Sequence, residues 1–238
     1  MRGPTEPNEF DVCYMRVDPK VVVKKLSQDD PNIRSLMVWH CKRFDVEVLR
    51  RFSELRSLRI AYWYGESLEA LTCMPHLEHL HIYMLPRIDD FTPFEKLKNL
   101  RALTLNAGIW SDLQQIKTFA PLGQLTELFL IHFFGLVPED GRIDHMLTSP
   151  SLTDINLADV HSFTELAAAI HRRPDLKRFF VPVQSWGDEK CEKCGADIMR
   201  LLGLHGTRRR KYACVQCHAK RIQDHESAFE AVYKSVAL

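Results

Sequence analysis

The sequence has 238 residues, enough for one or two domains, and its 45% hydrophobic and 26% charged residues are ordinary for a soluble globular protein. Its 32 Lys and Arg residues nearly balance 31 Asp and Glu residues, so the net charge of +1 gives no overall attraction to nucleic acid or to an anionic membrane. No apolar run approaches the ~20 residues needed to span a bilayer, and the first ten residues lack an apolar signal core. We therefore expect a cytoplasmic protein whose seven cysteines are thiols or metal ligands rather than disulfides.

Residues 1–32 predict a polar tail followed by an N-terminal cap. The run from Tyr14 to Val17 favours a short strand. Asp18 can then cap a helix that has Pro19 in its first position and buries Val22 and Leu26.

Residues 33–184 are organised around one recurring phrase, an aliphatic residue followed by two more at positions +3 and +5. The copies are Ile33/Leu36/Val38, Leu55/Leu58/Ile60, Leu77/Leu80/Ile82, Leu100/Leu103/Leu105, Leu125/Leu128/Leu130, Leu152/Ile155/Leu157 and a degraded Leu176/Phe179/Val181. Successive copies are 22 to 27 residues apart, a period typical of repeat proteins. Because alternate residues of a strand face the same way, the +3 and +5 residues of stacked copies would form a continuous core.

These copies resemble the leucine-rich repeat family, whose pattern is L-x-x-L-x-L-x-x-N/C-x-L. The apolar positions match, whereas the Asn/Cys position matches only at Cys41. The resemblance implies an α/β horseshoe with a parallel sheet on its concave face. Helical returns are expected after Asp45, Thr92, Asp112 and Ser162, the last with a capping-box pattern that includes Glu165.

The concave face is expected to bind a partner protein. By the strand alternation, its outward residues include Trp39, Arg59, His79, His81, Tyr83, Asn106, Phe129 and Ile131, with Arg178 and Phe180 from the degraded copy. Trp110 and Phe133, expected in loops after two strands, would extend the patch. Aromatic residues and Arg are typical of protein-binding hot spots. His79 and His81 could instead bind a metal or titrate, but no further ligands are evident on the adjacent strands.

Residues 185–238 predict a separate zinc ribbon-like module followed by a C-terminal helix carrying Ile222, Phe229, Val232 and Val236. Its four cysteines, Cys191, Cys194, Cys214 and Cys217, have the spacing C-x2-C-x19-C-x2-C. Four thiolates at this spacing can close a tetrahedron around Zn²⁺ and leave no open position for catalysis, so we expect a structural zinc. The pattern resembles zinc-ribbon and treble-clef modules.

Two other chemistries also fit parts of this cysteine pattern. The run from Cys214 to His218 also fits c-type haem attachment, and a lone C-x-x-C fits redox chemistry. Either reading would leave the matching pair Cys191 and Cys194 unexplained.

The sequence contains no Gly-rich phosphate loop and no nucleophile elbow, so we expect no enzymatic activity. The favoured function is a scaffold that holds one partner, most specifically an inhibitor or immunity protein that neutralises a toxin or enzyme. The alternatives are an adaptor that recruits a larger complex, or a nucleic-acid-associated protein that binds through the basic run from Arg208 to Lys211.

Overall fold

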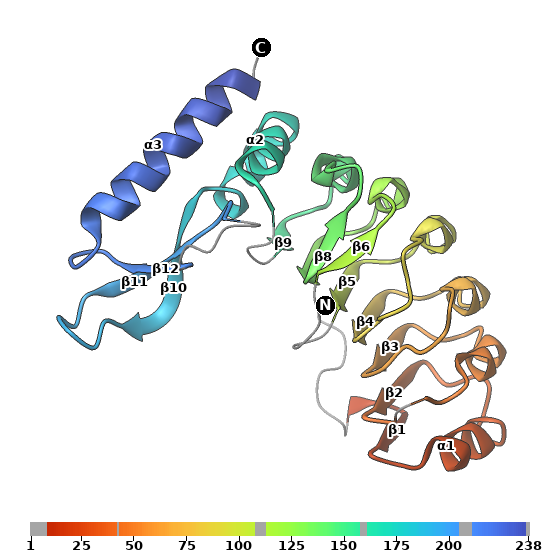
Figure 1. Ribbon diagram of the computed structural model, residues 1–238. Helices are drawn as coiled ribbons and strands as arrows, with labels where there is room; N and C mark the ends of the chain where they lie inside the picture. The colour runs from red at the N-terminus through yellow and green to blue at the C-terminus, as the bar shows by residue number, and fades with distance from the viewer. Residues whose placement is uncertain (1–8, 42, 108–112, 158–160, 205–210, 237–238) are drawn as a thin grey trace.

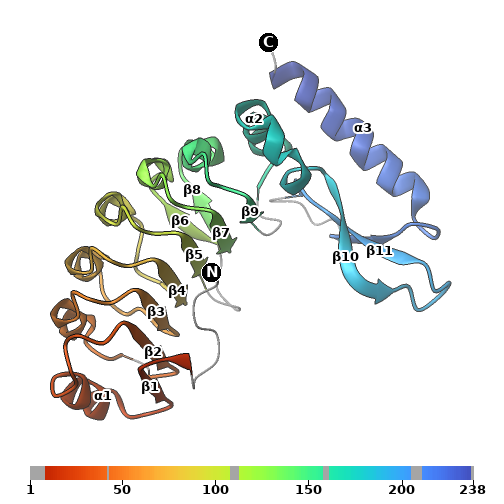
Figure 2. The same ribbon diagram turned by 180° about the vertical axis from the view of Figure 1, so that it is seen from behind.

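The computed structural model describes residues 9–41, 43–107, 113–157, 161–204 and 211–236. These residues form an arc with strands on the inner side and short helices on the outer side (Figures 1 and 2). The inner side is a seven-stranded sheet in the order β1-β2-β3-β4-β5-β7-β9, and all its neighbouring strands are parallel. Its strands are β1 (Val12–Met15), β2 (Ser35–Trp39), β3 (Ser57–Ile60), β4 (His79–Tyr83), β5 (Ala102–Asn106), β7 (Leu130–Phe134) and β9 (Asp154–Asn156).

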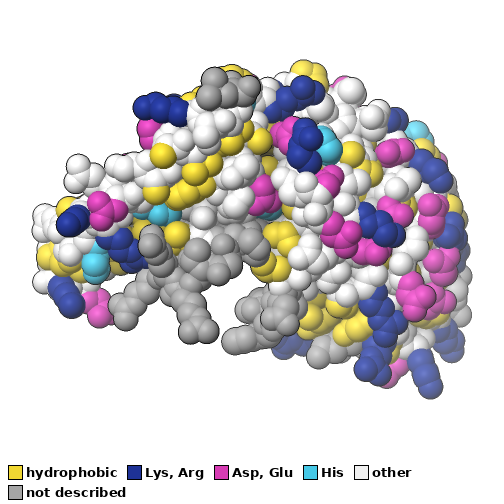
Figure 3. Space-filling view, turned by 45° about the horizontal axis from the view of Figure 1, so that its top comes forward, with side chains coloured by type: hydrophobic (Ala, Val, Ile, Leu, Met, Phe, Trp, Pro, Cys, Tyr) yellow, Lys and Arg dark blue, Asp and Glu magenta, His cyan; other side chains and the backbone are white. Residues whose placement is uncertain are grey.

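The returns on the outer side are mostly 3-10 helices rather than the longer helices of many repeat proteins. They are Val46–Arg51, Glu69–Cys73, Thr92–Lys96, Ala120–Gln124, Ile143–Thr148 and Pro174–Phe179. The Asp45 side chain caps the first of them, as the sequence predicts, by accepting a hydrogen bond from the Glu47 amide. Acidic and basic side chains are interspersed over this helical side of the repeats (Figure 3).

An α-helix lies at each end of the repeats. Helix α1 (Pro19–Leu26) is capped by the Asp18 side chain and buries Val22 and Leu26, the residues that the sequence predicts for these roles. Helix α2 (Phe163–Arg172) begins with the predicted capping box of Ser162 and Glu165.

The core is continuous from one repeat to the next because the +3 and +5 residues of neighbouring strands stand in register. Leu58 pairs with Leu80, and Ile60 pairs with Ile82. Nearly all of these side chains are completely buried. A parallel-sheet solenoid of this kind, with apolar residues at the +3 and +5 positions, has the architecture of leucine-rich repeats.

The fifth copy adopts a different frame from the one predicted. Leu128, Ile131 and Phe133 face the core, with Ile131 opposite Leu103 and Phe133 opposite Leu105. The sequence fits the +3/+5 phrase from Leu125 and from Leu128 equally well. The chain adopts the frame that starts at Leu128 because this frame buries the Phe133 ring, whose centroid lies 5.3 Å from that of Phe119.

Two further expectations are wrong. The segment after Asp112 forms strand β6 (Gln114–Ile116) rather than a helix, and β6 pairs in parallel with β8 (Leu136–Pro138). The degraded copy at Leu176 adds no strand to the sheet: residues Pro174–Phe179 form a 3-10 helix, and Phe180 is buried instead of facing outward.

The C-terminal module consists of a three-stranded antiparallel sheet and a long helix. The strands are β10 (Val183–Lys190), β11 (Asp197–Leu201) and β12 (Tyr212–Cys214), and the helix is α3 (Ala219–Val236). Helix α3 lies beside α2 (Figures 1 and 2), where the Phe229 ring packs 5.4 Å from that of Phe163. The module therefore prolongs the arc, with its sheet on the same inner side as the repeats.

Candidate binding face and metal centre

The concave surface of the main sheet is built from the outward positions of its strands. In β2, β3, β4, β5 and β7 these are Ser35, Met37, Trp39, Ser57, Arg59, His79, His81, Tyr83, Ala102, Thr104, Asn106, Leu130, His132 and Phe134. Only Arg59 among them carries a permanent charge, although 26% of the whole chain is charged. Depletion of charge and enrichment of aromatic residues mark the centre of protein-binding surfaces.

A cluster of rings surrounds Trp39 at one end of this surface. The indole lies 5.7 Å from His81 and 5.9 Å from Tyr83, measured between ring centroids. The Arg59 guanidinium carbon stands 4.6 Å from the centre of the Trp39 ring, within the range of a cation–π contact. Ala61 is small and fully buried here. The sequence therefore correctly placed Trp39, Arg59, His81 and Tyr83 together on one face.

The cluster continues past the strand ends through residues that the sequence analysis missed. His40 lies 5.6 Å from both Trp39 and Tyr62, and Tyr62 stacks on Tyr64 at 6.0 Å. We call the connected set Trp39, His40, Tyr62, Tyr64, His81 and Tyr83 the aromatic row. The strand pattern could not have identified Tyr62 and Tyr64, because alternation in phase with Leu58 and Ile60 would turn them inward, whereas Trp63 is the residue that is buried.

His81 is held as a neutral ring by its surroundings. Burial, then the positive charge of Arg59 and then His132, lower the pKa of His81 to about 4. At neutral pH the ring therefore offers a hydrogen-bonding and stacking surface without a charge, and Arg59, over the Trp39 ring, is the fixed cation beside the aromatic row.

The other predicted binding residues have mixed outcomes. His79 and Asn106 are outward and half-buried, as expected. Phe129 lies one residue before the N-terminal end of β7, where its amide donates to the Arg101 carbonyl at 2.9 Å. Phe133 and Ile131 are fully buried in the core, so neither can belong to the face as the structure stands. Trp110 lies outside the described residues, as does the basic run Arg208–Arg210.

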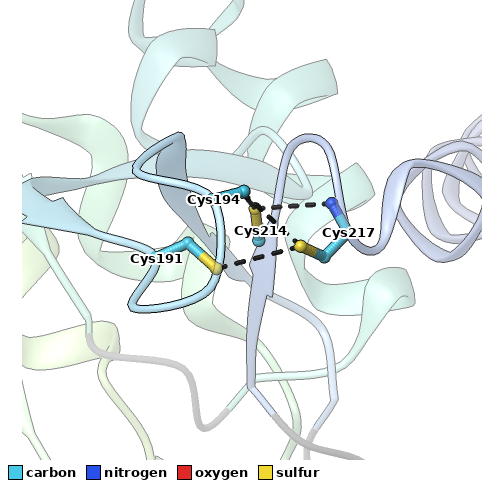
Figure 4. A group of neighbouring side chains, drawn as sticks. All are labelled: Cys191, Cys194, Cys214 and Cys217. Carbon is cyan, nitrogen blue, oxygen red and sulfur yellow. Dashed lines mark hydrogen bonds between the residues drawn. The ribbon is translucent and has the colours of Figure 1, made fainter.

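The four predicted cysteines meet at one point of the C-terminal module (Figure 4). Their sulfur atoms all lie within 4.8 Å of one another, with Sγ–Sγ distances of 3.4 Å for Cys194–Cys214, 3.5 Å for Cys194–Cys217 and 3.9 Å for Cys191–Cys217. A disulfide would need about 2.05 Å. A tetrahedron with metal–sulfur bonds of about 2.3 Å has edges of about 3.8 Å. The cluster can therefore hold a metal ion.

Two short turns position these thiols. Cys191 and Cys194 sit in a turn between β10 and β11 in which the Gly195 amide donates to the Cys191 carbonyl at 2.8 Å, and Gly195 has a φ of +73°. Cys214 ends β12, and the Cys214 amide donates to Nδ1 of His218 at 3.1 Å. His218 therefore supports the second turn through this hydrogen bond.

The local hydrogen bonds prepare one thiolate. The Cys217 amide, 3.4 Å from the sulfur of Cys214, lowers the pKa of Cys214 to about 7. The Cys217 thiol donates a hydrogen bond to the Cys194 sulfur and also lies beside Cys214, and these contacts raise the pKa of Cys217 to about 12, because loss of its proton would break that bond and crowd negative charge among the sulfurs. A cation among the sulfurs would remove this repulsion, and metal binding would then release protons.

The comparisons with known proteins give partial likenesses only. No model of a protein family matches the sequence, and no match is found among curated proteins. Among solved structures, internalin C2 of Listeria monocytogenes is 20% identical with a TM-score of 0.44, over 54% of this chain and 53% of that one. Internalin F of the same organism is 18% identical with a TM-score of 0.46, over 58% of this chain and 39% of that one. The fold assignment therefore depends on the sheet and its register.

No helix among the residues described here has the length and apolar character that crossing a bilayer requires.

Proposed function

We propose that this chain is a non-enzymatic scaffold that holds a partner protein on its concave face. The observation that carries the proposal is the aromatic row, in which five ring contacts, three of them made by Trp39, connect six rings on the repeats. Rings already packed against one another lose little conformational freedom on binding, so they are efficient contacts. The low charge of the neighbouring strand positions suits the dry centre of an interface.

In this proposal the four-cysteine site holds a structural Zn²⁺. Four thiolates suit zinc, and the sulfur–sulfur distances bracket the edge of a zinc–thiolate tetrahedron. Among the described residues, the module's own buried apolar cluster is small: Leu201, Leu204 and Ala213, with Val183 and Ile222 packed against it, so a bound metal would add substantially to its stability. The ion's role is to fix the turns that end β10, begin β11 and follow β12.

The specific partner we propose is a toxin or enzyme that the horseshoe inhibits by covering its active site, in the cytoplasm. This part depends on analogy between compact horseshoes and on the absence of catalytic motifs in the sequence. An adaptor would use the same face but would leave its partner active.

The test is affinity capture from native lysate, with and without nuclease, followed by an activity assay of the captured protein. A stoichiometric protein that survives nuclease and is lost with the Tyr83→Ala variant supports the scaffold. Inhibition of that protein at equimolar chain supports the inhibitor role, whereas full activity contradicts that role and leaves the scaffold standing. Loss of all binding on nuclease treatment would contradict both.

A further inference from the structure

A second, chemically different site lies at the far end of the concave surface, where the repeats meet the C-terminal module. A cleft of about 250 Å³ opens there between the end of the main sheet and the three-stranded sheet. One wall consists of His132, Asp154 and Asn156 from β7 and β9. The opposite wall consists of Gln184 and Arg200 from β10 and β11. Neither unit forms the cleft alone.

The floor of the cleft is apolar. Leu166, Phe180 and Leu202 line it, and each of these side chains is almost completely buried. Phe179 adds a half-buried ring at the side. A ligand in the cleft would therefore lay an apolar body on this floor. The cleft volume is smaller than the 300 Å³ or more typical of drug-sized pockets, so that body should be about the size of one side chain.

The polar side chains of the two walls indicate which chemical group the other end of that ligand carries. Among the residues that the structure describes, Asp154 is the one acidic side chain lining the cleft, and its Oδ1 is 3.1 Å from Nε2 of His132. On the opposite wall, Arg200 stands directly across from Gln184 in the sheet register, and both side chains line the cleft. A guanidinium at the edge of a low-dielectric cleft favours an anionic oxygen pair that it can hold in a fork.

We propose that this cleft binds a ligand with a short apolar body that ends in a carboxylate. The body lies on Phe180 and Leu202, and the carboxylate meets Arg200, with the side-chain amide of Asn156 within the same cleft. Two sources share this chemistry: a small carboxylic acid, and the C-terminal residue of a protein chain. This inference does not depend on the aromatic row, which lies at the other end of the sheet.

The cysteine cluster supports one wall of the cleft. Ile198, two residues before Arg200 in β11, pairs with Cys214 in β12, and Arg200 itself pairs with Tyr212. The metal that the four cysteines hold would therefore keep β11 in place. Removal of the metal should weaken ligand binding in the cleft even when the repeats remain folded.

The test is titration of the full, zinc-loaded chain with 4-methylpentanoate, followed by NMR of the Arg200 guanidinium and the Asn156 amide. The uncharged match is 4-methylpentanamide, and the cationic match is 3-methylbutylamine. We expect the carboxylate to shift both signals. Its affinity should exceed that of the amide by at least about tenfold, because a hydrogen bond to a charged group contributes about 1.5 kcal/mol or more. Absence of carboxylate binding, or equal or tighter binding of the amide or amine, would overturn the proposal.

The variants are Arg200→Gln and, on the other wall, Asn156→Asp, with the exposed Arg101→Gln as control. Both cleft variants should weaken 4-methylpentanoate at least about tenfold with unchanged melting temperature and zinc content, and the control should not. Unchanged affinity in both folded cleft variants would contradict the assignment. A peptide acetyl-Ala-Ala-Leu with a free carboxylate separates the two sources: tighter binding than 4-methylpentanoate indicates a protein C-terminus, and weaker binding indicates a small acid.

Discussion

Trp39 and Tyr83 contact each other across an intervening strand. Trp39 ends β2 and Tyr83 ends β4, yet their ring centroids are 5.9 Å apart. This contact requires a small residue at the matching position after β3, and Ala61 provides it with a fully buried side chain. The outward face is therefore a packed surface before any partner arrives, and its shape depends on one alanine.

The frame of the fifth repeat gives the first prediction. Phe133 is fully buried against Phe91 and Phe119, whereas its neighbour Phe134 faces outward and is half-buried. Phe133→Ala should lower the free energy of unfolding by about 3–5 kcal/mol, and Phe134→Ala by much less. Chemical denaturation of both variants measures this. Equal losses, or a larger loss for Phe134→Ala, would favour the frame that starts at Leu125.

That repeat also illustrates what the sequence could not decide. The +3/+5 phrase predicted the sheet, its parallel order and the inward residues of the other five clean copies, because the period alone determines them. Around Leu128 two frames satisfy the phrase, and only packing against Phe119 from the preceding return selects one. Similarly, the apolar spacing of Ile116 and Phe119 resembled a helix, while the pairing of β6 with β8 depends on a segment more than twenty residues away.

The seam between α2 and the module gives the second prediction. Gly203 has a φ of +79°, and a Cβ atom there would lie 2.1 Å from Cδ1 of Phe163. Gly203→Ala should therefore cost about 3 kcal/mol or more, from left-handed strain and from displacement of a ring that packs on α3. Gly141→Ala is the matched control, since Gly141 has a φ of +64° with open space around it, and should cost only about 1 kcal/mol. Thermal unfolding compares the two, and similar losses would contradict the packing at this seam.

The cysteine cluster gives the third prediction. The purified chain should contain one zinc ion per chain, and Cys194→Ser should lose it. Because metal binding contributes on the order of 10 kcal/mol to folding such a site, a strong chelator should unfold the module while the repeats persist. Metal analysis gives the stoichiometry, and limited proteolysis should then cut after residue 183 and leave the repeats intact. A chain free of zinc whose module resists proteolysis would contradict the structural role.

Prediction of this site from sequence was direct, and prediction of the aromatic row was partial, for a physical reason. In the spacing C-x2-C-x19-C-x2-C, each cysteine pair lies within one short turn, so the sequence itself brings the two thiols of a pair together. The ring contacts of His40 and Tyr62, by contrast, are made by residues just beyond the strands, where alternation no longer fixes direction. The cleft beside Arg200 could not be predicted, because it exists only once the module docks on the repeats.

His81 gives the fourth prediction. Unfolded, this residue takes up a proton near its ordinary pKa of 6.5, whereas in the folded protein burial and Arg59 lower its pKa to about 4. Because the unfolded state binds more protons between these values, stability should fall as the pH drops from about 6.5 to about 4, by about 3 kcal/mol at most. The variant His81→Gln should lose less stability over this range than the wild type. The exposed His76→Gln should behave as the wild type, and an equal acid response of all three proteins would contradict the burial of His81.

The most direct measurement of the central claim is the dissociation constant of the captured partner for wild type, Arg59→Ala and Tyr83→Ala. The control is Arg50→Ala, which removes an ion-paired arginine from the outer, helical side. If the aromatic row is the binding surface, each concave-face variant should lose about 2 kcal/mol, or roughly thirtyfold in affinity, with little change in melting temperature. Arg50→Ala should bind as the wild type does. If both concave-face variants keep full affinity, the partner binds elsewhere and the account is contradicted, whether or not Arg50→Ala loses affinity.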